Sequence, residues 1–262
     1  MEGRGGEREL GVTQSLQVGP GQRNAGHAGG PSAGDALTND NRNLWSSHAI
    51  DLRESRLQKV VRFIAEERPG RMLDLGCGAG EFSVRFVAGG WEVFGLELVA
   101  SQASRATARG LRAVAGEVTA GLPFRPEAFD LVFAGEIIEH LVDTDGFLAE
   151  IRRVLRVDGV LVVTTPNLAS FENRLRLLLG RYPEWVDYRV GSSGHVRAYT
   201  PRVLKAQLAE HGFRVERHVG NWVPIVPQRF TDDVKWPWLR ATGDWWPNLA
   251  MAIIVKCRKT PS

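Results

Sequence analysis

Apolar positions recur at helical spacing directly after Asp51 and then alternate between two kinds of segment. The apolar residues at 57, 60, 61, 64 and 65 predict a helix that ends at Pro69-Gly70. Short apolar runs predict strands at 72–75, 91–98, 111–115, 130–134 and 160–165. Periodic segments between them predict helices at 81–87, 101–109 and 136–155, the last with a break near 143–145. Strands that alternate with helices of this length indicate a doubly wound α/β fold with a mostly parallel sheet.

The last third of the chain departs from this alternation. Helices are predicted at 171–179 and 201–211, and strands at 213–219 and 251–256. Between the last two strands lies an aromatic stretch with Trp236, Trp238, Trp245 and Trp246. Aromatic side chains bury a large area and often line substrate pockets. We therefore predict that residues 168–247 cover a substrate site; the alternative is that the last three tryptophans cap the edge of the sheet.

The first forty residues contain ten glycines and show no helical or strand period. Such a segment buries too little apolar surface to offset its ordering entropy. Residues 1–40 are therefore predicted to be a disordered tail, and residues 41–262 to form one domain. Across the chain, 33 basic residues oppose 30 acidic ones, with the two signs interspersed. A net charge of +3 does not by itself predict nucleic acid or an anionic membrane as a partner.

Two cysteines, Cys77 and Cys257, lie far apart in apolar surroundings. They can build neither a disulfide framework nor a cysteine-based zinc site, which fits the reducing cytosol, so we expect a cytoplasmic protein. The sequence has no apolar run of 18 residues and no charged-then-apolar start. Neither a membrane span nor a signal peptide is therefore predicted.

A glycine-rich turn joins the first predicted strand to the following helix, in the order Asp74-Leu75-Gly76-Cys77-Gly78-Ala79-Gly80. Glycine lets the backbone adopt positive φ and approach a ligand closely. The spacing is G-x-G-x-G followed by Glu81, not G-x-G-x-x-G, and an acidic residue at a helix start disfavours a pyrophosphate. The turn therefore suits a ligand without phosphates, which disfavours an NAD-dependent oxidoreductase.

Two further acidic residues end neighbouring predicted strands. Glu97 ends the second strand, 21 positions after Gly76, where a carboxylate can accept hydrogen bonds from both hydroxyls of a ribose. Glu117 closes the third strand, where it could meet an adenine edge. Open α/β sheets bind ligands at the carboxyl ends of their strands, so we expect these positions to lie together.

Over roughly residues 50–257, the sequence resembles class I S-adenosylmethionine-dependent methyltransferases. The segments that carry the resemblance are LDLGCGAG at 73–80, GLE at 95–97, LPF at 122–124, FDLV at 129–132, EIIEHL at 136–141 and TPN at 165–167. The resemblance implies a seven-stranded sheet with an antiparallel last strand, and S-adenosylmethionine as the cofactor. It also implies that Asp74 and the glycines hold the methionine part, Glu97 the ribose and the Glu117 region the adenine. The candidate cofactor-binding residues are Asp74, Gly76, Cys77, Gly78, Gly80, Glu97, Leu98 and Glu117.

After the fourth predicted strand come Glu136, Glu139 and His140, which share one face if this segment is helical. Two carboxylates and an imidazole could bind Mg²⁺, Mn²⁺ or Zn²⁺, with His195 as a fourth ligand. The pattern resembles two metal-dependent branches of the family, the ubiquinone-biosynthesis O-methyltransferases and the small-RNA 3′-terminal 2′-O-methyltransferases. The RNA branch also has a later histidine before an aromatic-Thr pair, which is Tyr199-Thr200 in this chain.

Three interpretations of this second cluster stay open. A divalent cation would remove the repulsion between Glu136 and Glu139. Alternatively, His140 or His195 acts without a metal as the general base for an acceptor hydroxyl. In the third interpretation the acidic residues only stabilise the start of a helix, by about 0.3–1 kcal/mol each. These four residues are thus both the catalytic and the metal-binding candidates.

The activity expected from these motifs is O-methylation of a small hydroxylated acceptor: a phenol, a quinol, or a hydroxyl of a sugar or lipid-linked intermediate. Methyl transfer from a sulfonium needs mainly proximity, alignment and a deprotonated acceptor. The alternatives are RNA 2′-O-methylation and a non-catalytic module that binds S-adenosylmethionine. The arginines at 174, 176 and 181 are interpreted as a solvated helix face, so nucleic acid is not the expected partner. The cluster at 136–140 argues against a module without catalysis.

Overall fold

The computed structural model describes residues 51–186, 194–225 and 236–261. The predicted tail at 1–40 lies outside these residues, as does the stretch at 226–235. Seven strands form one sheet in the order β3-β2-β1-β4-β5-β7-β6. They are β1 (Arg71–Leu75), β2 (Glu92–Glu97), β3 (Arg112–Ala115), β4 (Phe129–Gly135), β5 (Leu155–Pro166), β6 (Phe213–Gly220) and β7 (Ala252–Lys259). Only β7 runs antiparallel to its neighbours, which confirms the predicted fold class.

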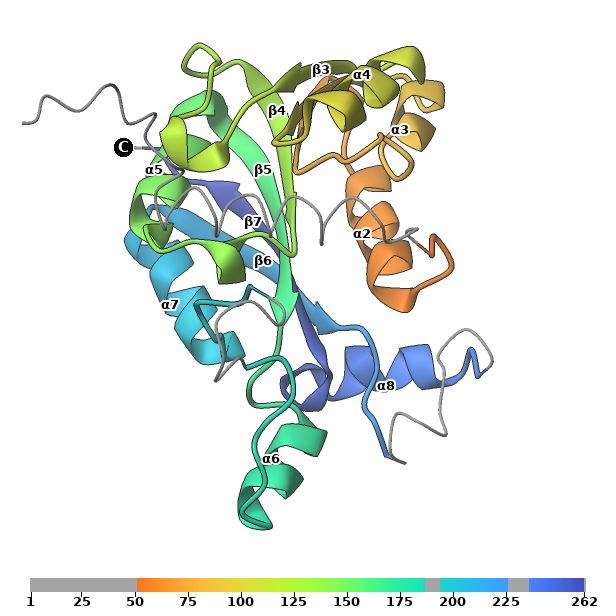
Figure 1. Cartoon of the computed structure of the whole chain (residues 1–262), viewed down its shortest axis with the longest axis vertical. Coiled ribbons are helices and arrows are strands. Elements are labelled where there is room, and N and C mark those ends of the chain that lie inside the picture. Colours follow the sequence, from red (N-terminus) through yellow and green to blue (C-terminus); the bar gives the residue numbers. More distant parts are fainter. Residues whose placement is uncertain (1–50, 187–193, 226–235, 262) are drawn as a thin grey trace, which may run out of the picture.

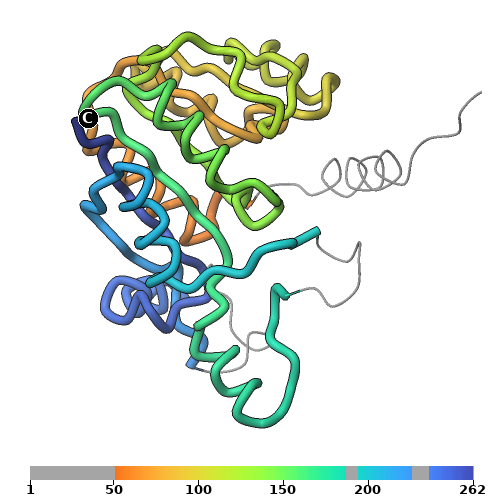
Figure 2. Tube along the Cα trace, turned by 90° about the vertical axis from the view of Figure 1, so that its left-hand side faces the viewer, coloured from red at the N-terminus to blue at the C-terminus, as the bar shows by residue number. Residues whose placement is uncertain are grey.

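Helices cover both faces of this sheet. The α-helices of the described residues are α2 (Ser55–Ala65), α3 (Val84–Ala88), α4 (Ala100–Ala108), α5 (Thr144–Val154), α6 (Phe171–Leu178), α7 (Pro201–Glu210) and α8 (Leu239–Trp245). Short 3₁₀ turns are η1 (Val118–Ala120), η2 (Ile138–His140) and η4 (Pro247–Leu249). Figure 1 shows α2, α3 and α4 on one side of the sheet and α5 and α7 on the other. The views in Figures 1 and 2 place α6 beyond the end of the sheet.

The sheet separates two apolar cores, one under each helix layer. Consecutive side chains of a strand point to opposite faces, so Leu73 and Leu75 enter one core and Met72 enters the other. The helix α5 contributes Ile151 to the first core, and α2 contributes Val60 to the second. The alternation of apolar side chains within β1 thus lets the strand pack against both helix layers at once.

The strand order reverses between β1 and β4. From β1 the chain builds outward to β2 and β3, and it then returns to the other side of β1 to form β4. Ligands of open α/β sheets bind beside such a switch point, at the carboxyl ends of the strands. The glycine-rich turn follows β1, Glu97 ends β2, Glu117 lies just after β3 and Glu136 follows β4. The topology therefore brings these positions to one edge of the sheet.

The segment predicted as helical from 136 to 155 differs from the prediction in its first part. Only Thr144–Val154 is α-helical, and its N-terminus is capped by Asp143, whose Oδ1 accepts from the Gly146 N–H at 2.8 Å. Glu136 has a positive φ of 55°, and its N–H donates to the Thr164 carbonyl at 3.0 Å. Glu136 therefore continues the β4–β5 pairing, and its expected place on one α-helical face with Glu139 and His140 is wrong.

The longest described helices, α2 and α5, have 11 residues each. A helix needs about 20 apolar residues to cross a bilayer. Within the described ranges, no helix is long and apolar enough to span a membrane.

Candidate functional site

The turn after β1 depends on glycine. Gly76, Gly78 and Gly80 have φ values of 67°, 54° and 78°, a region that other residues rarely adopt. A Cβ on Gly80 would lie 3.2 Å from the backbone and side chain of Ala106. The last glycine therefore also lets the turn approach α4. Cys77 is buried in this turn, and its Sγ faces Gly95 on β2, where an added Cβ would lie 2.5 Å away.

Glu97 ties this turn to the end of β2. Its carboxylate accepts hydrogen bonds from the N–H groups of Gly78 and Val99, each at 2.9 Å and each to a different oxygen. A carboxylate oxygen can accept more than one hydrogen bond, so two backbone donors orient the group and leave lone pairs for a ligand. Leu98 follows with an exposed side chain, and Glu117 lies just after β3 at the same edge of the sheet.

Asp74 is buried at the end of β1. Its Oδ2 accepts a hydrogen bond of 2.6 Å from the hydroxyl of Ser83. Burial raises the pKa of Asp74 to about 7, Ser83 opposes this rise, and the nearby Glu97 carboxylate adds to it. Ser83 was missed by the sequence analysis, although a hydroxyl three residues after Gly80 is a recognisable partner for the acid. A buried carboxyl that ionises near neutral pH is suited to a cationic ligand.

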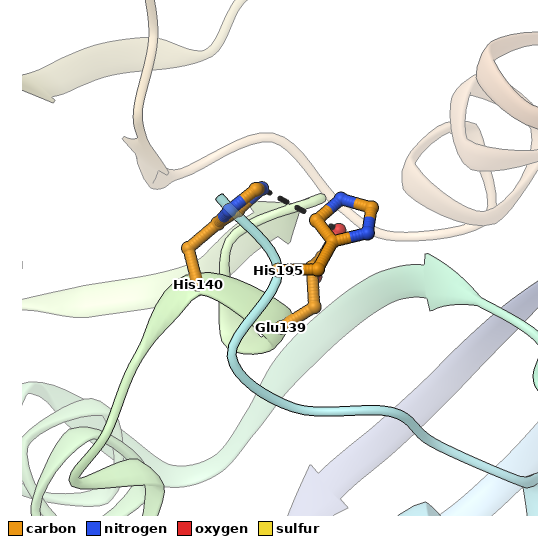
Figure 3. A group of neighbouring side chains, drawn as sticks. All are labelled: Glu139, His140 and His195. Atoms are coloured by element: carbon orange, nitrogen blue, oxygen red, sulfur yellow. Dashed lines mark ion pairs between the residues drawn. The ribbon is translucent and has the colours of Figure 1, made fainter. Parts of the chain in front are cut away.

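A second polar group contains Glu139, His140 and His195, whose potential ligand atoms all lie within 4.8 Å of one another. The first two come from η2 after β4, and His195 comes from a segment more than fifty residues later. Figure 3 shows the three side chains converging, with the two imidazole rings tilted against each other. Their ring centroids are 4.7 Å apart. The fold thus joins three of the four residues that the sequence had singled out.

Backbone carbonyls orient both imidazoles. The Nδ1 atoms of His140 and His195 lie 3.0 Å from the Gly194 carbonyl and 2.9 Å from the Trp185 carbonyl, respectively. A carbonyl only accepts, so each Nδ1 carries the hydrogen and each Nε2 carries the lone pair in the neutral rings. Metal-binding histidines usually show this arrangement. The hydrogen bond donated by the nitrogen that does not bind the metal fixes the ring orientation and makes the other nitrogen more basic.

Glu139 is buried, and its two carboxylate oxygens have different surroundings. Oε2 accepts from the Thr165 hydroxyl at 3.0 Å. Oε1 is buried, accepts no hydrogen bond from any described residue, and lies 4.0 Å from His140 Nε2. Burial, reinforced by the charge of Glu136, holds the pKa of Glu139 well above its usual range. A buried oxygen without a donor is costly, and a cation beside it would remove that cost.

The backbone of Glu139 also anchors the segment that carries His195. Its carbonyl accepts from the N–H groups of Val196 and Arg197 at 2.9 and 3.0 Å. These bonds explain how a histidine so distant in sequence reaches η2. They depend on a long-range approach of two loops, and no local pattern predicts them.

Glu136 has other partners. Its Oε1 accepts from the Thr164 hydroxyl at 2.7 Å and lies 3.8 Å from Nη1 of Arg56 on α2. Arg56 is largely buried and also pairs with Glu54. Arg56 and Thr164 were missed by the sequence analysis. The sequence did offer a signal for Thr164: the apolar strand predicted at 160–165 ends in two hydroxyl residues, Thr164 and Thr165.

A small pocket opens beside the polar group. Its polar lining comes from Glu139, Glu184, His195 and Arg197, and its apolar lining from Pro166, Leu168, Trp185, Val186 and Ala198. Its empty volume of about 210 Å³ is smaller than the roughly 300–1,000 Å³ of most small-molecule sites, so it accommodates at most part of an acceptor. The pocket wall is built partly from residues in the predicted cover at 168–247.

Comparison with known proteins supports the expected family. A family model described as a methyltransferase domain matches residues 49–218. A ubiquinone biosynthesis O-methyltransferase from a Bradyrhizobium strain is 37% identical over 101 residues, which cover 37% of this chain and 40% of that protein. A malonyl-[acyl-carrier protein] O-methyltransferase from Legionella pneumophila is 32% identical over 150 residues, covering 52% and 53%. The matched region thus spans about half or less of these relatives' length.

Solved structures share the fold. A crystal structure of an S-adenosylmethionine-dependent methyltransferase from Thermotoga maritima has a TM-score of 0.60 and 20% sequence identity. The similarity covers 86% of this chain and 97% of that one. At such an identity the likeness extends to the fold alone.

Proposed function

Because this chain belongs to the methyltransferase-domain family of class I S-adenosylmethionine-dependent proteins, we propose that it transfers the methyl group to a hydroxyl oxygen of a small acceptor. The observation that carries this proposal is the convergence of Glu139, His140 and His195 within 4.8 Å. A hydroxyl is a poor nucleophile until it loses its proton, and the group supplies candidates for holding or receiving that proton.

The turn after β1 is proposed to hold the methyl donor. S-adenosylmethionine, when bound, supplies a methyl group on a sulfonium. In the proposed site, Asp74 and the glycines at 76, 78 and 80 bind the methionine part, aided by Cys77. Glu97 accepts from the ribose hydroxyls, because two backbone N–H groups already aim its carboxylate. Leu98 and Glu117 flank the adenine.

The second group is proposed to hold a divalent cation through Glu139, His140 and His195. The buried Oε1 of Glu139 and the two carbonyl-oriented imidazoles fit such a role. A bound Mg²⁺, Mn²⁺ or Zn²⁺ would lower the pKa of an acceptor hydroxyl. Glu136 lies outside this group of three. Its carboxylate accepts a hydrogen bond from the Thr164 hydroxyl and contributes negative charge near the proposed ion. The metal-free form of the proposal makes His140 or His195 the general base.

Acceptor preference tests the proposed function. A cation can hold two adjacent oxygens at once, so we expect turnover with a catechol to exceed that with a simple phenol by about tenfold or more. The measurement is S-adenosylhomocysteine formation with catechol, phenol, a primary amine and a ribonucleoside. Turnover of the amine alone would contradict O-methylation, and preference for the ribonucleoside would favour the RNA alternative. Binding of S-adenosylhomocysteine without turnover of any acceptor would favour a non-catalytic module.

Residues 168–247 are proposed to cover the acceptor site, and Trp245 and Trp246 at the C-terminal end of α8 test this. Trp245 and Trp246 are 69% and 51% exposed, which favours a cover over side chains buried against the sheet edge. Replacing both with Ala is expected to raise the KM for the acceptor at least about threefold, the loss of part of one aromatic contact. Affinity for S-adenosylhomocysteine should stay within about twofold, because α8 follows β6, which lies at the opposite end of the strand order from β2 and β3.

Trp222→Ala provides the contrasting control for this pair. Trp222 is buried in a small core with Leu239 and Met251, so its loss should lower the melting temperature markedly. Equal losses of folding and donor binding in the double variant would instead assign Trp245 and Trp246 a structural role.

A further inference from the structure

Trp185 has a backbone conformation that its residue type does not favour. Its φ is 65°, and bulky residues seldom adopt this left-handed region because the Cβ then crowds a carbonyl oxygen. Such a conformation persists only where the surrounding structure fixes it, and strained residues of this kind cluster at functional sites. The carbonyl of Trp185 accepts the hydrogen bond from Nδ1 of His195. The strained residue is therefore the one that orients this imidazole.

The peptide that precedes Trp185 is fixed by Asn173 of α6. Oδ1 of Asn173 accepts from the Glu184 N–H at 2.7 Å, and Nδ2 donates to the Glu184 carbonyl at 3.2 Å. One side-chain amide thus engages both backbone polar groups of Glu184. The carbonyl of Glu184 and the N–H of Trp185 belong to the same planar peptide, so these bonds fix the plane from which the chain turns at Trp185.

Asn173 is itself attached to the end of the sheet. It is buried, and its Nδ2 also donates to the carbonyl of Asn167, just after β5, at 3.4 Å. The N–H of Asn167 donates in turn to the Met251 carbonyl, just before β7, at 2.8 Å. The ion pair between Arg176 and the Glu184 carboxylate is partly exposed, so it stabilises this segment less than the buried amide does. Asn173 therefore connects the position of Glu184 to the sheet.

We propose that Asn173 is a positioning residue for His195 and acts through the backbone of Glu184 and Trp185. Its amide fixes the peptide before Trp185, and the positive φ directs the Trp185 carbonyl toward His195. That carbonyl keeps the hydrogen of the neutral ring on Nδ1. Nε2 then carries the lone pair, which a metal ligand or a general base requires. The part that Asn173 plays in methyl transfer rests on the proposed function, whereas the orientation of the ring does not.

The tautomer of His195 tests this proposal without any acceptor or methyl donor. ¹⁵N NMR at about pH 8, where imidazoles are neutral, should show the hydrogen on Nδ1 in the unchanged protein, with the signal assigned by its loss in His195→Gln. In Asn173→Leu, which fills the site but has no amide, the ring should change to the mixture of tautomers of a free histidine. Affinity for Zn²⁺ alone, measured by calorimetry, should fall by about tenfold or more, the usual cost of losing an outer partner of a ligand.

Asn221→Leu is the matched control. Asn221 is also a buried amide that bonds the backbone, because its Oδ1 accepts from the Ala252 N–H at 2.9 Å. The control should lower the melting temperature as Asn173→Leu does, yet leave the tautomer of His195 and the Zn²⁺ affinity unchanged. Loss of both in Asn221→Leu would assign the effect to general destabilisation and overturn the proposal.

Two variants of Trp185 test the proposal even if Asn173→Leu does not fold. Trp185→Pro fixes φ at about −65°, whereas Trp185→Gly removes the same indole and adopts the positive φ without strain. Trp185 is 45% exposed, so both variants should keep their melting temperature. Only the proline variant should lose the Nδ1 hydrogen of His195 and bind Zn²⁺ more weakly.

A hydrogen that stays on Nδ1 in Trp185→Pro, or in a folded Asn173→Leu, would overturn the proposal. A different result is expected if only the proposed cation is wrong. The tautomer would then change as described while the unchanged protein binds no Zn²⁺, which would support the positioning role and contradict the metal site.

Discussion

Glu139→Gln is expected to abolish methyl transfer, by at least about 10²-fold, while S-adenosylhomocysteine binds unchanged. Glutamine keeps the shape of the side chain and can still accept from Thr165. It lacks the charge needed to hold a divalent cation beside two neutral imidazoles. Excess EDTA should reproduce the loss, and Mg²⁺, Mn²⁺ or Zn²⁺ should restore activity to the unchanged protein alone. Initial rates and calorimetric titration of S-adenosylhomocysteine measure the two effects.

Glu136→Gln separates the proposed ligands from their neighbour. Glu136 is engaged by Thr164 and Arg56, so its variant should lose less activity than Glu139→Gln and should still respond to added metal. Full activity in excess EDTA, with no metal found by elemental analysis, would contradict the metal proposal. The pH profiles of His140→Gln and His195→Gln would then identify the base, because the limb due to that residue disappears in only one variant.

Asp74→Asn is expected to stabilise the fold and to weaken donor binding. The pKa of Asp74 is raised from 3.8 to about 7 by burial, so the folded protein holds this proton more tightly than the unfolded chain. Stability from this group is full below about pH 4 and is lost as the pH rises through about 7. Asparagine never ionises, so the variant should gain up to about 4 kcal/mol in unfolding free energy at pH 8 and almost nothing at pH 4.

Donor affinity should change in the opposite direction. Loss of a charged hydrogen-bond partner costs about 1.5–3 kcal/mol, which is roughly 10- to 100-fold in the Kd for S-adenosylhomocysteine. In the unchanged protein, this affinity should rise with pH up to about 7 and then level off, since the ionised carboxylate binds the amino group. Denaturant unfolding and calorimetry at pH 4, 6 and 8 measure the two quantities.

Glu97→Ala should lose donor affinity by a similar factor but gain no stability, because it also frees the N–H groups of Gly78 and Val99. Glu92→Ala, at the start of the same strand, is the matched control and should leave donor affinity unchanged. Unchanged affinity in Glu97→Ala would remove Glu97 from the ribose site. Asp74→Asn with lowered stability at pH 8 would contradict the cost assigned to its buried charge.

The chain order of strands and helices, and with it the sheet, was predictable from the sequence. Apolar periodicity separates a largely buried strand such as β4 from an amphipathic helix such as α5, and the short connections leave few topologies. The positive φ of Gly76, Gly78 and Gly80 followed from residue type, because glycine alone adopts it without strain. The meeting of these glycines with Glu97 followed from topology, since both stand at the carboxyl ends of adjacent parallel strands.

Boundaries that depend on hydrogen bonds between distant segments were not predictable in this way. Periodicity assigned Glu136 to a helix, but its N–H is taken by Thr164 on β5, which holds it in the sheet. The spacing of Glu139 and His140 looked helical, yet one 3₁₀ turn suffices to bring them together. Helical spacing indicates which residues could share a face of a helix. It does not indicate which backbone group each N–H will bond in the folded chain.

By itself the sequence determined the fold class, the glycine turn and the identity of the polar residues, because these depend on residue type and near-neighbour spacing. Only the tertiary structure decided which polar residues meet. In the folded chain, Glu136 pairs with Arg56 and Oε1 of Glu139 is buried beside His140. Asp74 is buried enough that its pKa rises. The tertiary structure also leaves the leucines of α6 exposed. Burial and charge pairing arise from contacts between segments far apart in the chain, so no local pattern encodes them.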